Sequence, residues 1–96
     1  MTLTYHAKNR MDLRVITENM IKNCLLFGKK ENKGSFVEFV DHLISVLISN
    51  DKIITVKPCK KVSKAIKQDV RVYGMSRRKA LYHYFYSHGA YLQKAL

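Results

Sequence analysis

The stretch from residue 36 to residue 56 most constrains the fold of this chain, because it is dense in the β-branched and aromatic residues that favour strands. Two polar pairs, Asp41-His42 and Asn50-Asp51, cut this stretch into pieces of strand length. The pattern therefore predicts a three-stranded antiparallel meander over residues 35–41, 43–49 and 52–57.

The same stretch also carries a helical signal. Ser35 and Glu38 have the spacing of a capping box, and the apolar side chains from Phe36 to Leu47 recur three and four residues apart. Residues 36–48 could therefore form one amphipathic helix instead of two strands, and the sequence leaves both interpretations open.

Two helices are predicted before the meander. Thr4 is a suitable N-cap for a helix that runs through Met11, and Thr17 is a suitable N-cap for the next helix. Gly28 is a natural stop for that second helix.

Helix signals return after Pro58, which ends the last strand because proline lacks the backbone donor that a ladder needs. The spacing predicts a helix over 62–73, with Val62, Ile66, Val70 and Tyr73 on its buried face. Gly74 ends that helix, and Ser76 caps another over 77–88.

These elements predict an α+β fold, with two N-terminal helices on a small antiparallel three-stranded sheet and a C-terminal helical appendage. We expect residues 1–58 to form the α+β core and residues 59–96 to form a basic helical extension packed on the same core. A chain of 96 residues, 47% of them hydrophobic, has room for one such core and is too apolar for a disordered segment.

Several classes of protein are excluded by what the sequence lacks. No run approaches the ~18 apolar residues of a membrane span, and residues 1–20 contain no apolar block, so we expect no secretory signal and a cytoplasmic protein. Cys24 and Cys59 form no disulfide framework, and no metal-ligand spacing or glycine-rich phosphate loop occurs. We therefore expect no metal and no cofactor.

Positive charge is concentrated in the second half of the chain. The protein has 18 Lys and Arg against 7 Asp and Glu, a net charge of +11. Residues 57–96 contain ten of these basic residues and one acid, and folding alone would not favour such crowding of like charges. We therefore predict a nucleic-acid partner and no membrane, with RNA favoured over DNA.

The predicted nucleic-acid contacts are basic or aromatic residues on outward helix faces. Arg77, Arg78 and Lys79 occupy the first turn of a helix, where they oppose the helix dipole and favour an external anion. Tyrosines four apart on an outer face can stack on unpaired bases. The full set is Lys60, Lys61, Lys64, Lys67, Arg71, Arg77, Arg78, Lys79, Tyr82, His83 and Tyr86.

A motif over residues 4–57 resembles a known family. It consists of Tyr5-His6-Ala7-Lys8-Asn9-Arg10-Met11, then Arg14, Ile16-Thr17 at the start of a helix, Leu26-Phe27-Gly28, and Ile53-Ile54-Thr55-Val56. The chain is similar to a small bacterial and phage domain of unknown function that opens with an H-A-x-x-R-M helix and closes with an I-x-T-V strand. That family resembles RelE and ParE toxins and the wider group of ribonucleases that includes barnase and colicin E5.

The resemblance implies helices on one face of an antiparallel sheet, RNA on the other face, and an RNA-directed toxin or endoribonuclease whose protein partner is a cognate antitoxin or a host protein. His6 and Arg10 are the motif positions that carry over. This sequence departs from the family at Val15, which replaces a glycine, and in its basic tail after Pro58.

Metal-independent RNA cleavage needs a proton acceptor for the 2′-hydroxyl and a cation for the phosphorane charge. His6, Arg10 and Lys8 supply these groups on one helix, so they are the candidate catalytic residues. The alternative is structural: His6 bonds a backbone carbonyl, and Arg10 caps a helix end or pairs with a nearby acid.

A second function stays open. The segment 62–88 has the proportions of a helix-turn-helix, and residues 74–85 resemble the recognition helix of TetR-type repressors, with one extra residue that rotates the helix by about 100°. This favours a non-catalytic DNA-binding or regulatory protein. A third class is a phage or plasmid protein that inhibits a host nucleic-acid-binding complex by occupying its nucleic-acid channel. Most proteins that mimic nucleic acid in this way are acidic, and the net charge of +11 argues against this class.

Overall fold

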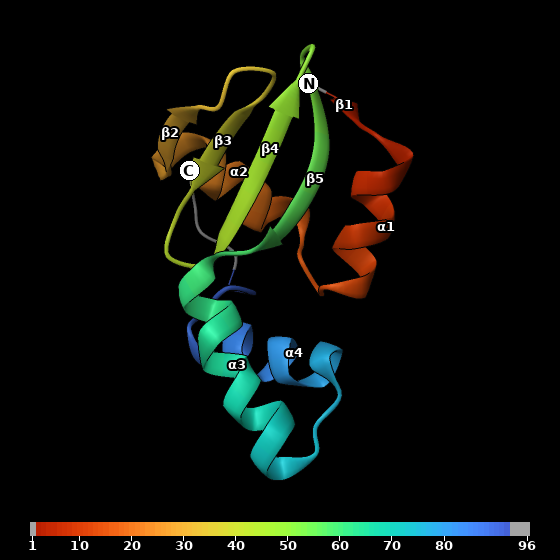
Figure 1. Ribbon diagram of the computed structural model, residues 1–96, viewed down its shortest axis with the longest axis vertical. Coiled ribbons are helices and arrows are strands. Elements are labelled where there is room, and N and C mark those ends of the chain that lie inside the picture. The colour runs from red at the N-terminus through yellow and green to blue at the C-terminus, as the bar shows by residue number, and fades with distance from the viewer. Residues whose placement is uncertain (1, 93–96) are drawn as a thin grey trace.

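The computed structural model describes residues 2–92. In chain order, the elements are β1 (Thr2–Leu3), α1 (Tyr5–Leu13), α2 (Glu18–Phe27), β2 (Lys29–Asn32), β3 (Val37–Val40), β4 (Ile44–Ser49), β5 (Lys52–Pro58), α3 (Lys60–Tyr73) and α4 (Arg77–Ser87). The strands form one sheet in the order β1-β5-β4-β3-β2 (Figure 1). The α+β class is confirmed, but the predicted three-stranded antiparallel sheet is wrong, since the sheet has five strands and is mixed.

The two strands that the sequence did not predict lie at the two edges of the sheet. β1 has two residues, too few for an alternating pattern, and it pairs in parallel with the start of β5. β2 consists of charged and polar residues with low strand preference. It forms because its backbone pairs with β3 over four residues, an interaction that does not depend on side chains and leaves no pattern in the sequence.

The predicted meander is confirmed as β3, β4 and β5, and the alternative of a helix over 36–48 is wrong. Asp41 Oδ1 accepts hydrogen bonds from the backbone N–H groups of Leu43 and Ile44, both at 2.8 Å, which fixes the turn into β4. Asn50 and Asp51 have φ angles of 52° and 61°, the left-handed values that a tight hairpin turn requires. Both turns therefore lie at the polar pairs that predicted them.

The N-terminal helices begin at the predicted caps. Thr4 Oγ1 accepts from the N–H of Ala7 at 3.1 Å and donates to the carbonyl of Ile53 at 3.0 Å, so one side chain starts α1 and attaches it to β5. Thr17 Oγ1 caps α2. Gly28 ends α2 with a negative φ, and a Cβ there would collide with the carbonyl oxygens of Cys24 and Val40. Glycine is needed here because α2 and β3 approach closely.

The C-terminal helices pack into the same core as the sheet. Val62 and Ile66 of α3 and Leu81 and Phe85 of α4 are fully buried in one cluster with β4, β5 and α2. Gly74 ends α3 in the left-handed conformation, with φ at 66°. The two helices of the basic extension are therefore attached to the sheet through a shared core.

Two residues of α3 depart from the predicted buried face. Val70 is 37% exposed and Tyr73 is 72% exposed, because the last turns of α3 extend away from the sheet (Figure 1). Apolar residues recur at helical spacing to the end of α3, but the core covers only the earlier turns of the helix.

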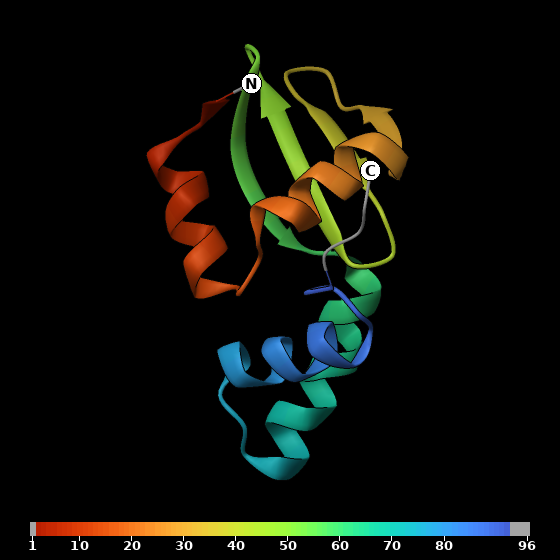
Figure 2. The same cartoon turned by 180° about the vertical axis from the view of Figure 1, so that it is seen from behind.

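The helices leave one face of the sheet uncovered. α2 crosses one face, α1 lies along β5, and α3 and α4 lie beyond one end of the sheet (Figure 2). The side of the sheet that faces the viewer in Figure 1 carries no helix. Within residues 2–92, no helix has the length and apolar character that crossing a membrane would require.

Candidate nucleic-acid interface

α1 brings the side chains of His6 and Arg10 together. The residues are four apart on one helix face, and Arg10 Nε donates to His6 Nε2 at 3.5 Å. A guanidinium only donates hydrogen bonds, so Nε2 carries a lone pair in this contact. Lys8, the third predicted catalytic residue, faces elsewhere, because two residues along an α-helix turn a side chain by about 200°. The structure therefore joins two of the three predicted catalytic residues.

Arg14 lies at the end of α1 beside this pair. Its Nη1 donates to the carbonyl of Val56 on β5 at 2.6 Å, which fixes the guanidinium in place. Partial burial lowers the pKa of Arg14, and the positive charges of Arg10 and Arg77 lower it further. Arg14 was not among the predicted site residues, although its spacing of four from Arg10 is a signal for a shared helix face.

The first turn of α4 contacts the C-terminal end of α1 through Arg78. Arg78 Nε donates to the carbonyl of Asp12 at 3.2 Å, and Arg78 Nη2 lies 4.0 Å from the Asp12 carboxylate. A cation at the C-terminal carbonyls of α1 is stabilised by the helix dipole. The positive charge of Arg78 is thus offset by α1, even though it opposes the dipole of α4.

We use the name arginine cluster for Arg10, Arg14, Arg77 and Arg78. Arg10 lies on α1 and Arg14 caps its C-terminal end, while Arg77 and Arg78 lie in the first turn of α4, far away in the sequence. Within residues 2–92, the cluster makes one ion pair, between Arg78 and Asp12. The other three arginines therefore form no ion pair in the described part of the chain.

The tyrosines of α4 lie beside the arginine cluster. The rings of Tyr82 and Tyr91 are stacked, with centroids 5.5 Å apart, and Tyr82 also contacts Tyr86 at 6.0 Å. Tyr82 and Tyr86 are exposed, as predicted for stacking residues. Tyr91 is half-buried and its hydroxyl donates to the carbonyl of Val15 at 2.8 Å.

A row of basic residues lies on α3, opposite its buried face. Residues spaced by four, three and four along an α-helix share one side, and the buried Val62 and Ile66 lie on the other side. We use the name basic stripe for Lys60, Lys64, Lys67 and Arg71, all of which are exposed. Lys61 is also exposed but is turned about 100° from Lys60.

The predicted contacts on α4 also lie on its outer surface. Lys79 and His83 are exposed, and they are four residues apart on the side opposite the buried Leu81 and Phe85. Every residue of the predicted footprint is therefore accessible.

The uncovered face of the sheet is not uniformly basic. Strand pairing places Glu31, Glu38 and Leu47 side by side on the face opposite the buried Val46. Ser45 Oγ donates to Glu38 at 2.5 Å, and Lys33 lies 2.8 Å from Glu31. The hydrogen bond from Lys33 lowers the pKa of Glu31. The strand register also places the exposed Lys29 and Lys57 on this face, so it carries charges of both signs.

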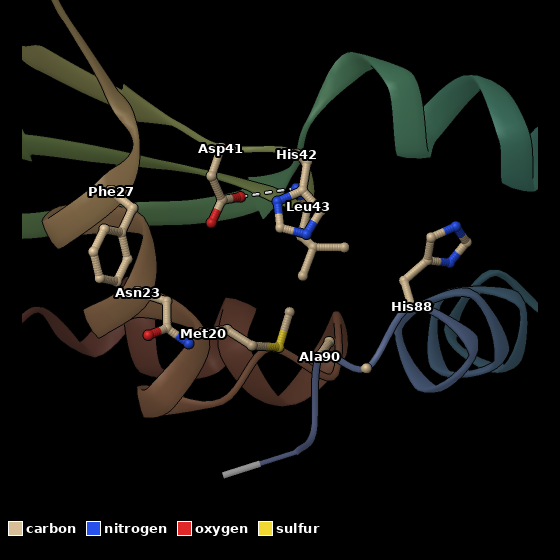
Figure 3. A pocket seen from close by; sticks show the side chains of 9 residues that line it. Met20, Asn23, Phe27, Asp41, His42, Leu43, His88 and Ala90 are labelled. Atoms are coloured by element: carbon tan, nitrogen blue, oxygen red, sulfur yellow. Dashed lines mark hydrogen bonds between the residues drawn. The ribbon is translucent and has the colours of Figure 1, made fainter. Parts of the chain in front are cut away.

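A separate cavity of about 340 Å³ lies between α2, the turn before β4 and the end of α4. His42 and His88 lie on its rim, and Asp41 reaches it from the turn (Figure 3). His88 Nδ1 donates to the carbonyl of Tyr84 at 2.8 Å, and the two rings stack at 4.0 Å. Sequence reasoning missed this juxtaposition, since no local pattern links the two histidines.

The described part of the chain contains no group of three or more residues arranged to hold a metal ion. Cys24 and Cys59 are buried free thiols. Burial raises the pKa of Cys24 to about 12, so it remains a thiol and not the thiolate that binds metal.

Comparison with protein-family models, curated proteins and solved structures finds no match to this chain.

Proposed function

We propose that this protein binds RNA, with the arginine cluster holding the phosphate backbone and the basic stripe of α3 extending the contact. The observation that carries the proposal is that Arg14, at the end of α1, lies within electrostatic reach of Arg10 on α1 and of Arg77 on α4, while Arg78 is held on the last turn of α1. Guanidinium groups bind phosphate oxygens through paired, charge-assisted hydrogen bonds, so they are well suited to this role.

Stability alone does not account for the cluster. Like charges held close together repel, and the lowered pKa of Arg14 reflects this repulsion from Arg10 and Arg77 as well as burial. A bound phosphate would replace repulsion with attraction. Hydrogen bonds to backbone carbonyls hold the guanidinium groups of Arg14 and Arg78 in position, so this part of the site is formed before an anion binds.

The same geometry favours RNA over a helix-turn-helix mode on duplex DNA. A recognition helix places its N-terminal residues against base edges in the major groove. In this fold Arg78, in the first turn of α4, is directed toward Asp12 on α1. The DNA-binding alternative would require this contact to open.

The contact between His6 and Arg10 favours RNA cleavage as a second function. When RNA binds, Arg10 would exchange its contact with His6 for one with the phosphate, which frees the Nε2 lone pair of His6. Nε2 would then accept the proton of a 2′-hydroxyl as its oxygen attacks the adjacent phosphorus and the bond to the 5′ oxygen breaks. Arg10 would stabilise the charge on the phosphorane, and water would protonate the leaving oxygen. This chemistry matches the RelE-like ribonuclease that the sequence motif suggests.

Binding is tested with fluorescence-labelled RNA and variants of matched charge. Arg77→Gln should weaken RNA binding about tenfold, which corresponds to about 1.4 kcal/mol, because it removes an exposed cation of the cluster. Lys22→Gln removes an exposed cation of α2, remote from the cluster, and should change affinity little. Equal loss in both variants, or no binding by the wild type at low salt, would refute the proposal.

A further inference from the structure

A groove lies between the end of α1 and the side of α4, next to the arginine cluster. Its volume is about 360 Å³, at the small end of the ~300–1,000 Å³ range of ligand sites. Met11 and Val15 form apolar parts of its wall, and Tyr82 and Tyr91 form the aromatic part. We infer that this groove receives one unpaired base of the bound RNA, so that the protein selects single strands. The inference rests on the proposed RNA-binding function.

The aromatic part of the groove is fixed before binding. Tyr82 and Tyr91 are nearly parallel, with an angle of 24° between their planes. The hydroxyl of Tyr91 is anchored on the carbonyl of Val15, and burial raises the pKa of Tyr91 to about 12, so the anchoring proton is retained. A base that packs against the exposed Tyr82 meets a rigid surface. Such a surface accepts any base, because every base has a π face.

The rim of the groove carries one acceptor and one donor. The Asp12 side chain is 83% exposed. Arg78 bonds the backbone of α1 through Nε and lies 4.0 Å from the Asp12 carboxylate through Nη2, but its side chain is 60% exposed, so N–H groups of the guanidinium remain accessible. The Watson–Crick edge of a base contains both donors and acceptors. These two side chains can therefore bond the edge of a base whose face lies on Tyr82.

The arginine cluster can hold the phosphate of such a nucleotide. Arg78 lines the groove, Arg77 precedes it in the chain, and the charge of Arg77 reaches Arg14 at the end of α1. A base bound in the groove would therefore place the sugar-phosphate backbone of its nucleotide next to these cations. In a duplex, bases are paired and stacked and cannot enter the groove, so a duplex would contact the cations alone.

The test compares three labelled RNAs on the full-length protein: a single strand, the same strand in a duplex, and the single strand with abasic sites. The wild type should prefer the intact single strand to the other two. In Tyr82→Leu, the preference for single strand over duplex should fall about tenfold, the size of one lost base stack. Tyr82→Phe keeps the ring and should restore the preference.

Tyr73→Leu is the matched control, since Tyr73 is an exposed tyrosine at the far end of α3, and it should leave the preference unchanged. Thermal unfolding of each variant separates loss of the groove from loss of the fold, and the abasic strand tests the wild type without any mutation.

Two outcomes would overturn the inference. The first is equal affinity for the three RNAs, which would leave the proposed RNA binding intact. The second is a loss of preference in Tyr73→Leu that matches Tyr82→Leu. Failure of the wild type to bind any of the RNAs would instead refute the proposed function itself.

Discussion

At the residue scale, the contact between His6 and Arg10 makes a specific prediction about RNA cleavage. His6→Ala removes the proton acceptor, so RNA degradation should fall by at least about 100-fold, the usual contribution of a general base. RNA binding should change little, because the phosphate contacts come from the arginines. Both quantities are measured on one RNA, by gel for cleavage and by anisotropy for binding.

His42→Ala provides the control for this prediction. His42 is exposed in the turn before β4 and lies outside the His6–Arg10 contact and the predicted footprint, so its removal should leave cleavage unchanged. Cleavage by His6→Ala at the wild-type rate would remove His6 from the site and leave RNA binding without catalysis.

Single residues were predictable from the sequence where the determining contact is local. Thr4, Thr17 and Ser76 cap their helices as expected, because each cap is decided within four residues. His6 and Arg10 meet for the same reason. The contact between Arg78 and Asp12 could not be predicted, since it depends on where the tertiary fold places α4.

At the element scale, the basic stripe of α3 predicts a change in salt dependence. Each phosphate contact on a single strand contributes about 0.7 to the slope of log affinity against log salt. Replacing Lys64 and Lys67 with glutamine should therefore reduce the magnitude of the slope by about 1.4. The slope is obtained by titrating single-stranded RNA at several salt concentrations.

Lys22→Gln/Lys52→Gln is the matched control for this pair. These lysines are exposed on α2 and β5, away from the stripe, and their loss changes the net charge by the same amount. If both double variants reduce the slope equally, the contribution comes from the overall charge and not from the stripe.

The sequence predicted most elements and missed those without a side-chain pattern. The strands of the meander and all four helices follow from periodicity, caps and turns. β1 and β2 do not, because β1 is too short for alternation and β2 is formed by backbone pairing of charged residues. The exposure of Tyr73 was missed for a related reason, since periodicity reports which side of a helix is apolar and not how far its partner extends.

At the scale of the whole molecule, the shared core predicts that the sheet and the two C-terminal helices unfold together. Phe85 of α4 is fully buried in the cluster that contains Val46 and Val56 of the sheet. Phe85→Ala should cost about 3–5 kcal/mol of stability and lower one unfolding transition. Tyr73→Ala, at an exposed position, should stay within about 0.5 kcal/mol of the wild type.

Circular dichroism reports the helices, and the quenching of tyrosine fluorescence reports the surroundings of α4 and the groove. Coincident transitions by both probes in chemical denaturant would agree with one cooperative unit. Two separated transitions, with Phe85→Ala shifting one of them, would show that the helical extension unfolds independently.

The arrangement of the candidate site is a property of the whole molecule. The distribution of charge along the sequence identifies the C-terminal part of the chain as the more basic. Two members of the arginine cluster, Arg10 and Arg14, nevertheless come from α1 and its C-cap in the less basic N-terminal part. The groove likewise needs α1, α4 and the segment after it in one place. The charge of the sequence predicts a nucleic-acid partner, but no local pattern predicts which residues the fold brings together at the site.

β2, the charged strand that periodicity did not reveal, closes one side of the sheet. Its outer backbone groups are not paired with another strand of the sheet, and an open strand of this kind invites a second molecule to add to it. Lys29 and Lys30 lie on that strand, and lysines on an edge strand disfavour the addition of a further strand. The charged residues that give β2 its low strand preference therefore also protect the protein against aggregation through the edge of its sheet.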